Sequence, residues 1–112
     1  MRKYIFLIFL LGVCFNYSFG QTPPSQVLAH RIANRMKDTL ALTALQTQSV
    51  YTINLNLDNS KMQARNLSTD RVIVGRAIQA LEKTRDSLYK IGLTPTQYQL
   101  YLQKKRNLIK SN

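Results

Sequence analysis

Histidine is the side chain on which acid-base catalysis and metal binding most often depend, and this sequence has only one, His30. A Ser-His-Asp arrangement would have to use it, and no serine lies in a nucleophile motif. A metal site would need His30 with Met36 and Met62, whose sulfur atoms suit soft ions such as Cu(I). The three residues lack the regular spacing of a ligand cluster, and methionine ordinarily packs in a core. We therefore predict no metal site and no cofactor.

Paired carboxylates are a second common catalytic arrangement, and Glu82 and Asp86 lie four residues apart. On a helix this spacing puts them on one face, where they repel each other. Arg85 and Lys90 stand at ionic spacing from them, so we expect a solvent-exposed row of ion pairs, each worth about 0.2 to 0.5 kcal/mol. The sequence also lacks a glycine-rich phosphate loop. It predicts a protein that is not an enzyme.

The first twenty residues have the features of a secretory signal peptide. Residues 1–3 are a short basic start, residues 4–15 form an apolar run, and residues 18–20 place small side chains before a cleavage point. Export would put the protein in the periplasm or outside the cell. Two alternatives are a lipid on Cys14 and an uncleaved anchor, although the apolar run is shorter than the ~20 residues that span a bilayer.

The chain that follows this leader is small and strongly basic. The whole sequence has 112 residues, with 16 Lys and Arg against 5 Asp and Glu. Arg2 and Lys3 belong to the predicted leader, so the 92 residues after it carry a formal charge of +9. The leader also holds every phenylalanine and the one cysteine, and there is no tryptophan. Without these residues a small chain buries little surface alone, and we expect a homodimer.

Helical periodicity runs through most of this basic part. After an extended lead-in at residues 21–24, apolar side chains recur at helical spacing in residues 25–38, 74–91 and 95–110. Gly92 is placed where a helix would stop. The sequence predicts one all-α domain, residues 25–112, built as a small bundle of about four helices.

The segment 40–67 is ambiguous. Residues 51–58 alternate apolar and polar side chains, as a half-buried strand does, but Val50, Ile53 and Leu57 also share one helical face. We favour a helix, because a strong helix-start signal precedes the segment.

That signal is a pattern, Leu-Thr-x-x-Gln, which occurs twice, 51 positions apart. The six matching residues are Leu42, Thr43, Gln46, Leu93, Thr94 and Gln97. A threonine at a helix N-cap accepts a hydrogen bond from the backbone N–H three residues on, and a glutamine there accepts one from the N–H of the cap. We therefore expect a helix to begin after each threonine, and Pro95 supports the second start.

With two such motifs in a small exported helical chain, the sequence resembles the Spy/CpxP family of bacterial periplasmic proteins, whose members carry paired LTxxQ motifs. The resemblance extends loosely from Leu28 to Leu108. It implies an all-α fold in which a long bent helical hairpin forms an antiparallel, cradle-like dimer. It also implies protein binding, since the family includes an ATP-independent chaperone, an inhibitor of an envelope-stress sensor kinase and metal-responsive relatives.

The basic residues are the remaining functional signal. Arg76, Lys83 and Lys90 recur every seven residues and fall on nearly one line of a helix, and Lys104 and Lys105 belong to a second cluster near the C-terminus. The positive electrostatic field of such residues attracts acidic partners. We expect these five residues to contribute most to the capture of a partner protein.

Two kinds of protein binding remain open. A holdase would bind many unfolded envelope proteins without ATP, whereas a regulator or adaptor would bind one envelope partner such as a stress sensor kinase. Contact with an anionic membrane surface is a third option for so basic a set of helices. We expect no nucleic-acid partner, because export removes the protein from the cytoplasm and its tyrosines form no recognisable stacking motif.

Overall fold

The computed structural model describes residues 24–111, which are all α-helical apart from short connections. The helices are α2 (Pro24–Leu40), α3 (Ala44–Leu67), α4 (Arg71–Gly92) and α5 (Pro95–Leu108). The described residues form no strand, so the predicted all-α fold is confirmed. The predicted leader at residues 1–20, Cys14 included, lies outside the described residues. Pro24, assigned to the extended lead-in, is instead the first residue of α2.

The ambiguous segment is a helix, since residues 51–58 lie inside α3. The buried side chains of α3 are Val50, Asn54, Leu57 and Ala64. They recur at helical spacing and share one face. Tyr51, Ile53 and Leu55 lie beside that face and are half-buried, and this explains why an alternating pattern was superimposed on the helical one.

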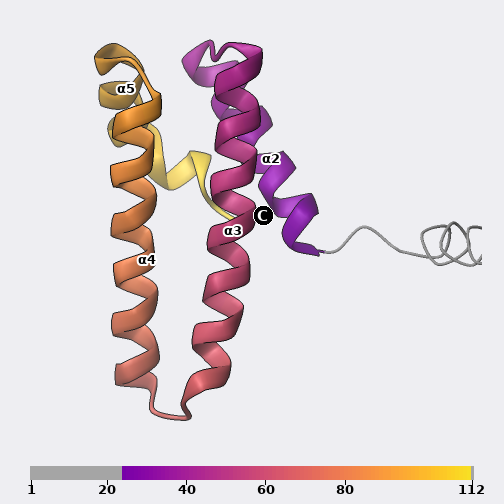
Figure 1. Cartoon of the computed structure of the whole chain (residues 1–112). Coiled ribbons are helices and arrows are strands. Elements are labelled where there is room, and N and C mark those ends of the chain that lie inside the picture. The colour runs from indigo at the N-terminus through magenta and orange to yellow at the C-terminus, as the bar shows by residue number, and fades with distance from the viewer. Residues whose placement is uncertain (1–23, 112) are drawn as a thin grey trace, which may run out of the picture.

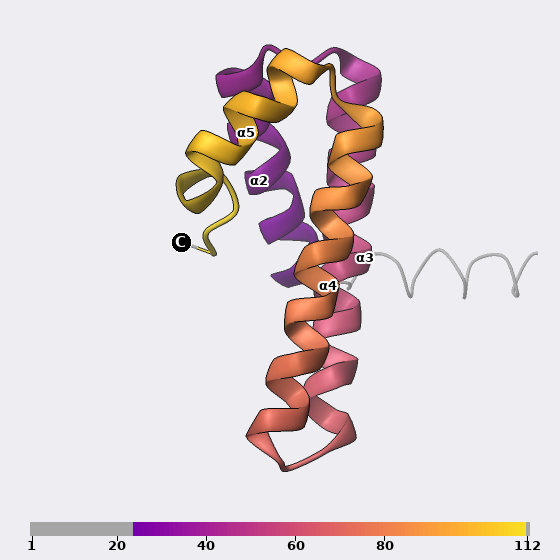
Figure 2. The same cartoon turned by 90° about the vertical axis from the view of Figure 1, so that its left-hand side faces the viewer.

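α3 and α4 run antiparallel, side by side, and form a long helical hairpin (Figure 1). α2 and α5 pack on one face of the hairpin, near the end at which α3 begins and α4 ends (Figure 2). We call this the inner face, and the opposite, uncovered face the outer face. Around the turn at residues 68–70 the hairpin projects beyond α2 and α5 as two helices alone.

The hydrophobic core lies where the four helices meet. α2 contributes Ile32 and Met36, α3 contributes Val50, and α4 and α5 contribute Tyr89 and Tyr101. The two tyrosine rings pack edge to face with their centroids 4.8 Å apart. Such a pair adds about 0.5 to 1.5 kcal/mol to the stability beyond the burial of area. Tyrosines thus supply the aromatic core of residues 24–111, which contain no Phe or Trp.

α2 and α4, the helices that precede the two Leu-Thr-x-x-Gln motifs, have different C-terminal ends. The end of α2 is a Schellman motif: Ala41 has a φ of 56°, and the N–H of Leu42 donates to the carbonyl of Lys37 at 3.3 Å. The prediction of a glycine stop at Gly92 is right in place and wrong in mechanism. The φ of Gly92 is not positive, and α4 ends because Leu93 is extended, with φ −100° and ψ 154°.

Candidate functional site

Both predicted capping boxes are present. The N–H of Gln46 donates to Thr43 Oγ1 at 3.1 Å, and the N–H of Thr43 donates to Gln46 Oε1 at 2.9 Å. Thr94 and Gln97 make the same two bonds at 3.2 and 3.0 Å. α3 and α5 therefore begin where the motif predicts.

The two motifs also meet each other. Gln46 Nε2 donates to Gln97 Oε1 at 2.8 Å, and Gln97 Nε2 donates to Gln46 Oε1 at 3.2 Å. Each amide also reaches the last residue of another helix, Gln46 at the carbonyl of Gly92 in α4 and Gln97 at the carbonyl of Leu40 in α2, both at 3.3 Å. The hydrogen bonds of these side chains are thus directed at other parts of the fold. The motif pair is a joint between four helix ends and not a ligand site.

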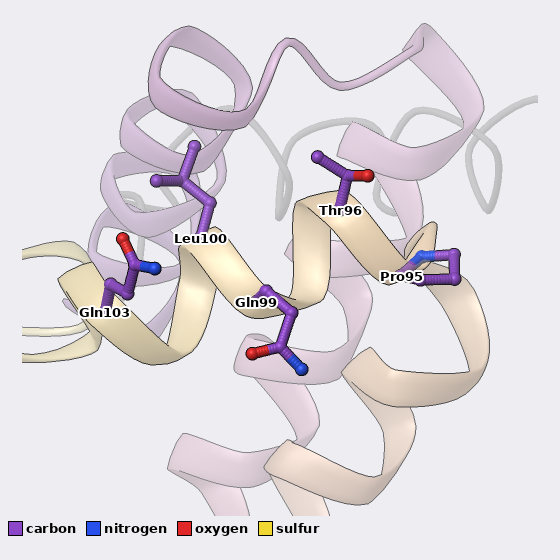
Figure 3. A pocket seen from close by; sticks show the side chains of 5 residues that line it. All are labelled: Pro95, Thr96, Gln99, Leu100 and Gln103. Atoms are coloured by element: carbon purple, nitrogen blue, oxygen red, sulfur yellow. The ribbon is translucent and has the colours of Figure 1, made fainter.

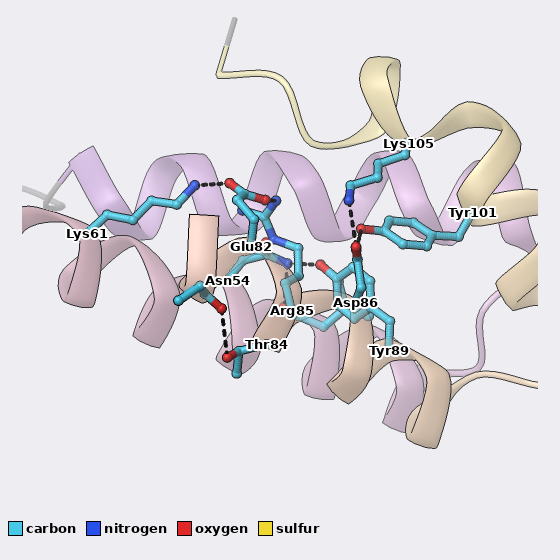
Figure 4. Close-up of polar contacts among 11 residues, drawn as sticks. Asn54, Lys61, Glu82, Thr84, Arg85, Asp86, Tyr89, Tyr101 and Lys105 are labelled. Atoms are coloured by element: carbon cyan, nitrogen blue, oxygen red, sulfur yellow. Dashed lines mark hydrogen bonds and ion pairs between the residues drawn. The ribbon is translucent and has the colours of Figure 1, made fainter. Parts of the chain in front are cut away.

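The carboxylate of Glu82 holds two cations on the inner side of α4 (Figure 4). It pairs with Lys61 of α3, and its Oε2 lies 2.6 Å from Arg85 Nη1. The predicted ion pair between Glu82 and Arg85 is present, but the row is not solvent-exposed as predicted: Arg85 is buried, and Lys90 forms no ion pair with a described carboxylate. The reason is that α3 covers this side of α4, which local spacing does not reveal.

Asp86, one turn further on, belongs to the contact between α4 and α5. It accepts hydrogen bonds from the hydroxyl of Tyr101 and from Lys105 Nζ, both at 2.7 Å. Burial first, and then the bond to Asp86, raise the pKa of the Tyr101 hydroxyl above its usual value. Burial also raises the pKa of Tyr89 to about 12. Both hydroxyls are therefore neutral, structural groups at ordinary pH.

A pocket of about 240 Å³ lies beside the two ion pairs of Glu82. We call it the inner pocket. Its lining is Leu28, Ile32, Asn54, Asp58, Lys61, Arg65, Arg85, Ile109 and Ser111. The segment after α5 is tied to α2 here, because Arg31 donates to the carbonyl of Ser111 at 3.0 Å and Arg35 to that of Lys110 at 2.7 Å. The lining carries three basic residues against one acidic residue.

Two polar side chains of the inner pocket are almost fully buried. Asn54 is 3% exposed and Arg85 is 5% exposed. Asn54 Nδ2 donates to the carbonyl of Val50 at 2.8 Å and to the hydroxyl of Tyr89. Asn54 Oδ1 and Arg85 Nε have no hydrogen-bond partner within the described part of the chain. Buried polar atoms are seldom left so, because their desolvation is then uncompensated.

Sequence reasoning missed this pocket, although one signal was present. Asn54 lies between Val50 and Leu57 on an apolar helical face, and Arg85 lies between Leu81 and Leu88 in the same way. A polar residue inside an apolar face is either satisfied by a partner or retained for a function. The sequence interpretation instead placed Arg85 in a solvent-exposed row of ion pairs.

The projecting end of the hairpin, residues 65–84, has no buried residue. We call this segment the hairpin tip. Leu67, Val72 and Ile73 are large apolar side chains with 82%, 60% and 55% of their surface exposed. A hollow of about 520 Å³ lies between its helices, lined by Arg65, Ser68, Thr69, Arg71, Val74, Gly75 and Ile78. Arg65 lines both this hollow and the inner pocket, so the two are neighbours.

The five predicted partner-binding residues are divided between α4 and α5. Arg76, Lys83 and Lys90 are exposed and lie along the side of α4 that faces away from α3, as their spacing predicts. Lys104 is exposed on α5. Lys105 is half-buried and paired with Asp86, so its charge is used within the fold.

His30, Met36 and Met62, the other residues considered for catalysis or metal binding, have ordinary structural surroundings. His30 is exposed and stacks on Tyr51 with a centroid distance of 4.1 Å. Met36 packs in the core as expected, whereas Met62 does not, since it is half exposed. Within residues 24–111 no three His, Cys, Asp or Glu side chains are grouped as metal ligands would be. None of the four helices described has the length and hydropathy of a membrane span.

A further hollow, of about 450 Å³, lies along α5 (Figure 3). Its lining is Pro95, Thr96, Gln99, Leu100 and Gln103, all from this one helix. None of these side chains is charged, and no second helix supplies an opposing group. The inner pocket and the hairpin tip are therefore the candidate functional site.

No protein-family model, no curated protein and no solved structure matches this chain. The resemblance to the Spy/CpxP family therefore stays a prediction from the two LTxxQ motifs and the pattern around them.

Proposed function

We propose that this protein binds other proteins through its hairpin tip and inner face, as an exported, ATP-independent holdase of the envelope. The observation that carries the proposal is the lack of any buried residue between positions 65 and 84. Two amphipathic helices normally bury their apolar stripes against a third element. Here Val74, Ile78 and Leu81 are only half-buried, and a bound partner would complete their burial.

The chemistry of the tip favours segments that are both apolar and acidic. Leu67, Val72 and Ile73 offer exposed apolar area, while Arg65 and Arg71 line the adjoining hollow. Long-range attraction would bring an acidic chain to this surface, and burial of apolar side chains would then hold it. Neither step needs a nucleotide. Patches that combine exposed apolar and charged groups are common at protein-binding sites.

Export is part of the proposal. It rests on the leader-like pattern of residues 1–20 and on the resemblance of the paired LTxxQ motifs to periplasmic proteins. The same surface would also serve a regulator that binds one envelope partner such as a stress sensor kinase, which is the alternative. The breadth of binding separates the two, because a regulator leaves the aggregation of unrelated proteins unchanged.

We further propose a homodimer, formed through the outer face. By helical spacing, this face carries uncharged side chains that are exposed or half-buried: Leu45, Ser49, Asn56 and Ser60 from α3, and Ala77, Ala80, Thr84, Leu88 and Ile91 from α4. Two strongly basic chains repel each other, and the repulsion is least where no charge lies at the contact. Light scattering should give the mass of a dimer, and Ala80→Arg should give a monomer, whereas Gln79→Arg on the neighbouring side of α4 should not. A monomeric wild-type protein would exclude this dimer.

An aggregation assay tests the holdase. Purified residues 21–112 are added without ATP to two unrelated unfolding proteins at low and moderate salt. Suppression of both, weaker at higher salt, is expected. The double variant Leu67→Gln with Ile73→Gln should lose most of the suppression. The control variant Val27→Gln with Leu102→Gln changes two exposed apolar side chains outside the hairpin tip and should keep it. A folded protein without effect on either client would favour the regulator.

A further inference from the structure

The charges around the inner pocket are unbalanced. Lys61 and Arg85 both pair with Glu82, and this one carboxylate therefore faces two cations. Their side chains are 15% and 6% exposed, and water screens their charges poorly. A partly buried cation without its own counter-charge is costly, and a bound anion would remove that cost.

The two atoms without a hydrogen-bond partner indicate which hydrogen-bonding groups a ligand of the inner pocket should have. Arg85 Nε–H is a hydrogen-bond donor and Asn54 Oδ1 is an acceptor, and both belong to residues that line the inner pocket. A donor beside an acceptor matches a ligand that can accept one hydrogen bond and donate another. A carboxylate attached near a peptide N–H has both properties.

The rest of the lining narrows the class of anion. Arg65 adds a third basic residue, but Asp58 also lines the pocket and would repel a doubly charged ion such as phosphate. Leu28, Ile32 and Ile109 provide an apolar wall that suits a short carbon stem. A volume of about 240 Å³ is enough for one acidic side chain with part of its backbone.

We propose that the inner pocket binds the carboxylate of an acidic residue in a bound protein segment, with Arg85 and Arg65 as its cationic contacts and Asn54 Oδ1 accepting from a neighbouring N–H. This inference rests on the proposed function, because it assigns the contact by which the inner face selects acidic clients. A free small carboxylate has the same charged group, and the experiment separates the two sources.

Fluorescence anisotropy of labelled peptides tests the proposal. Two ten-residue peptides of identical apolar sequence carry one central Glu or one central Gln. The Glu peptide should bind at least tenfold more tightly, since a charged hydrogen bond of this kind is worth about that factor. Butanoate and inorganic phosphate compete as unlabelled probes. Butanoate as effective as the Glu peptide would overturn the peptide source, and phosphate more effective than butanoate would overturn the carboxylate.

Variants locate the contact. Arg65→Gln, at an exposed rim residue, should weaken Glu-peptide binding about tenfold and leave Gln-peptide binding unchanged. Lys37→Gln removes the same charge from an exposed position of α2 outside the pocket and should change neither. Equal effects of the two variants would overturn the pocket and leave only general attraction. If the Glu and Gln peptides bind equally while aggregation is still suppressed, this inference fails and the holdase stands; if suppression is also absent, the proposed function fails.

Discussion

The side-chain amides of Gln46 and Gln97 are hydrogen-bonded to each other in both directions across 51 residues of sequence. Each oxygen also accepts the N–H of its own helix cap, and each nitrogen also donates to the last turn of another helix. Every donor and acceptor of the two amides is therefore used. The pair fixes the starts of α3 and α5 and the ends of α2 and α4 at one place.

This arrangement predicts that Gln97→Glu destabilises the protein although it preserves a capping box. A carboxylate can still accept the N–H of Thr94, and glutamate is common at this position of the motif. It cannot donate to Leu40 or Gln46, and it places two acceptors against each other. The free energy of unfolding in urea should fall by roughly 1 to 3 kcal/mol. A loss below about 0.5 kcal/mol would mean that only the capping function of Gln97 matters.

The joint also shows how far sequence reasoning reaches. The capping boxes depend on residues three apart, so Thr43 and Thr94 could be predicted as helix starts from local spacing alone. The bonds between Gln46 and Gln97 depend on how helices pack, and no local pattern contains that. Arg85 shows the same difference. Its pairing with Glu82, one turn away, could be predicted from local spacing, whereas its burial by α3 could not.

We predict that replacing Ala41 by glycine makes the protein more stable. It adopts a left-handed φ of 56°, which costs an L-residue with a Cβ roughly 1 to 2 kcal/mol. Ala41→Gly should therefore raise the free energy of unfolding by about 0.5 to 1 kcal/mol, after the larger entropy loss of glycine is subtracted. Thermal unfolding followed by circular dichroism measures the shift.

Gly92 provides the matched control, at the equivalent position of the second motif. Its φ is not positive, and a Cβ built there meets nothing within 4 Å. Gly92→Ala should therefore be neutral or stabilising by up to about 0.5 kcal/mol. If Ala41→Gly destabilises the protein instead, the left-handed end of α2 is not strained.

The burial of Tyr89 leads us to predict that the protein unfolds at alkaline pH. Burial raises its pKa from 10.0 to about 12 in the folded state. The folded state therefore disfavours the tyrosinate, and the stability from this group is complete below pH 10 and is lost as the pH rises towards 12. Helical signal and tyrosinate absorbance should change together in this range. Tyr89→Phe should reduce the dependence on pH, and ionisation of Tyr89 with full retention of helix would contradict the assigned burial.

The ion pairs of Glu82 lead us to predict an order of effects between two variants, Glu82→Gln and Lys61→Gln. Glu82→Gln leaves Lys61 and Arg85 close together and without a counter-charge, which should cost roughly 1 to 3 kcal/mol given the partial exposure of the Glu82 carboxylate. Lys61→Gln leaves one cation with one carboxylate and should cost less, about 1 kcal/mol or below. Urea unfolding at low and high salt measures both variants.

The dependence on salt distinguishes repulsion between Lys61 and Arg85 from a simple loss of packing as the cause of the destabilisation. Added salt should recover part of the stability of Glu82→Gln, because it screens the repulsion between Lys61 and Arg85, and should change Lys61→Gln little. A ligand carboxylate in the inner pocket should have the same effect, since it would supply the missing charge. If Lys61→Gln proves the more damaging variant, the two cations do not compete for Glu82 and the pocket has no excess positive charge to offer an anion.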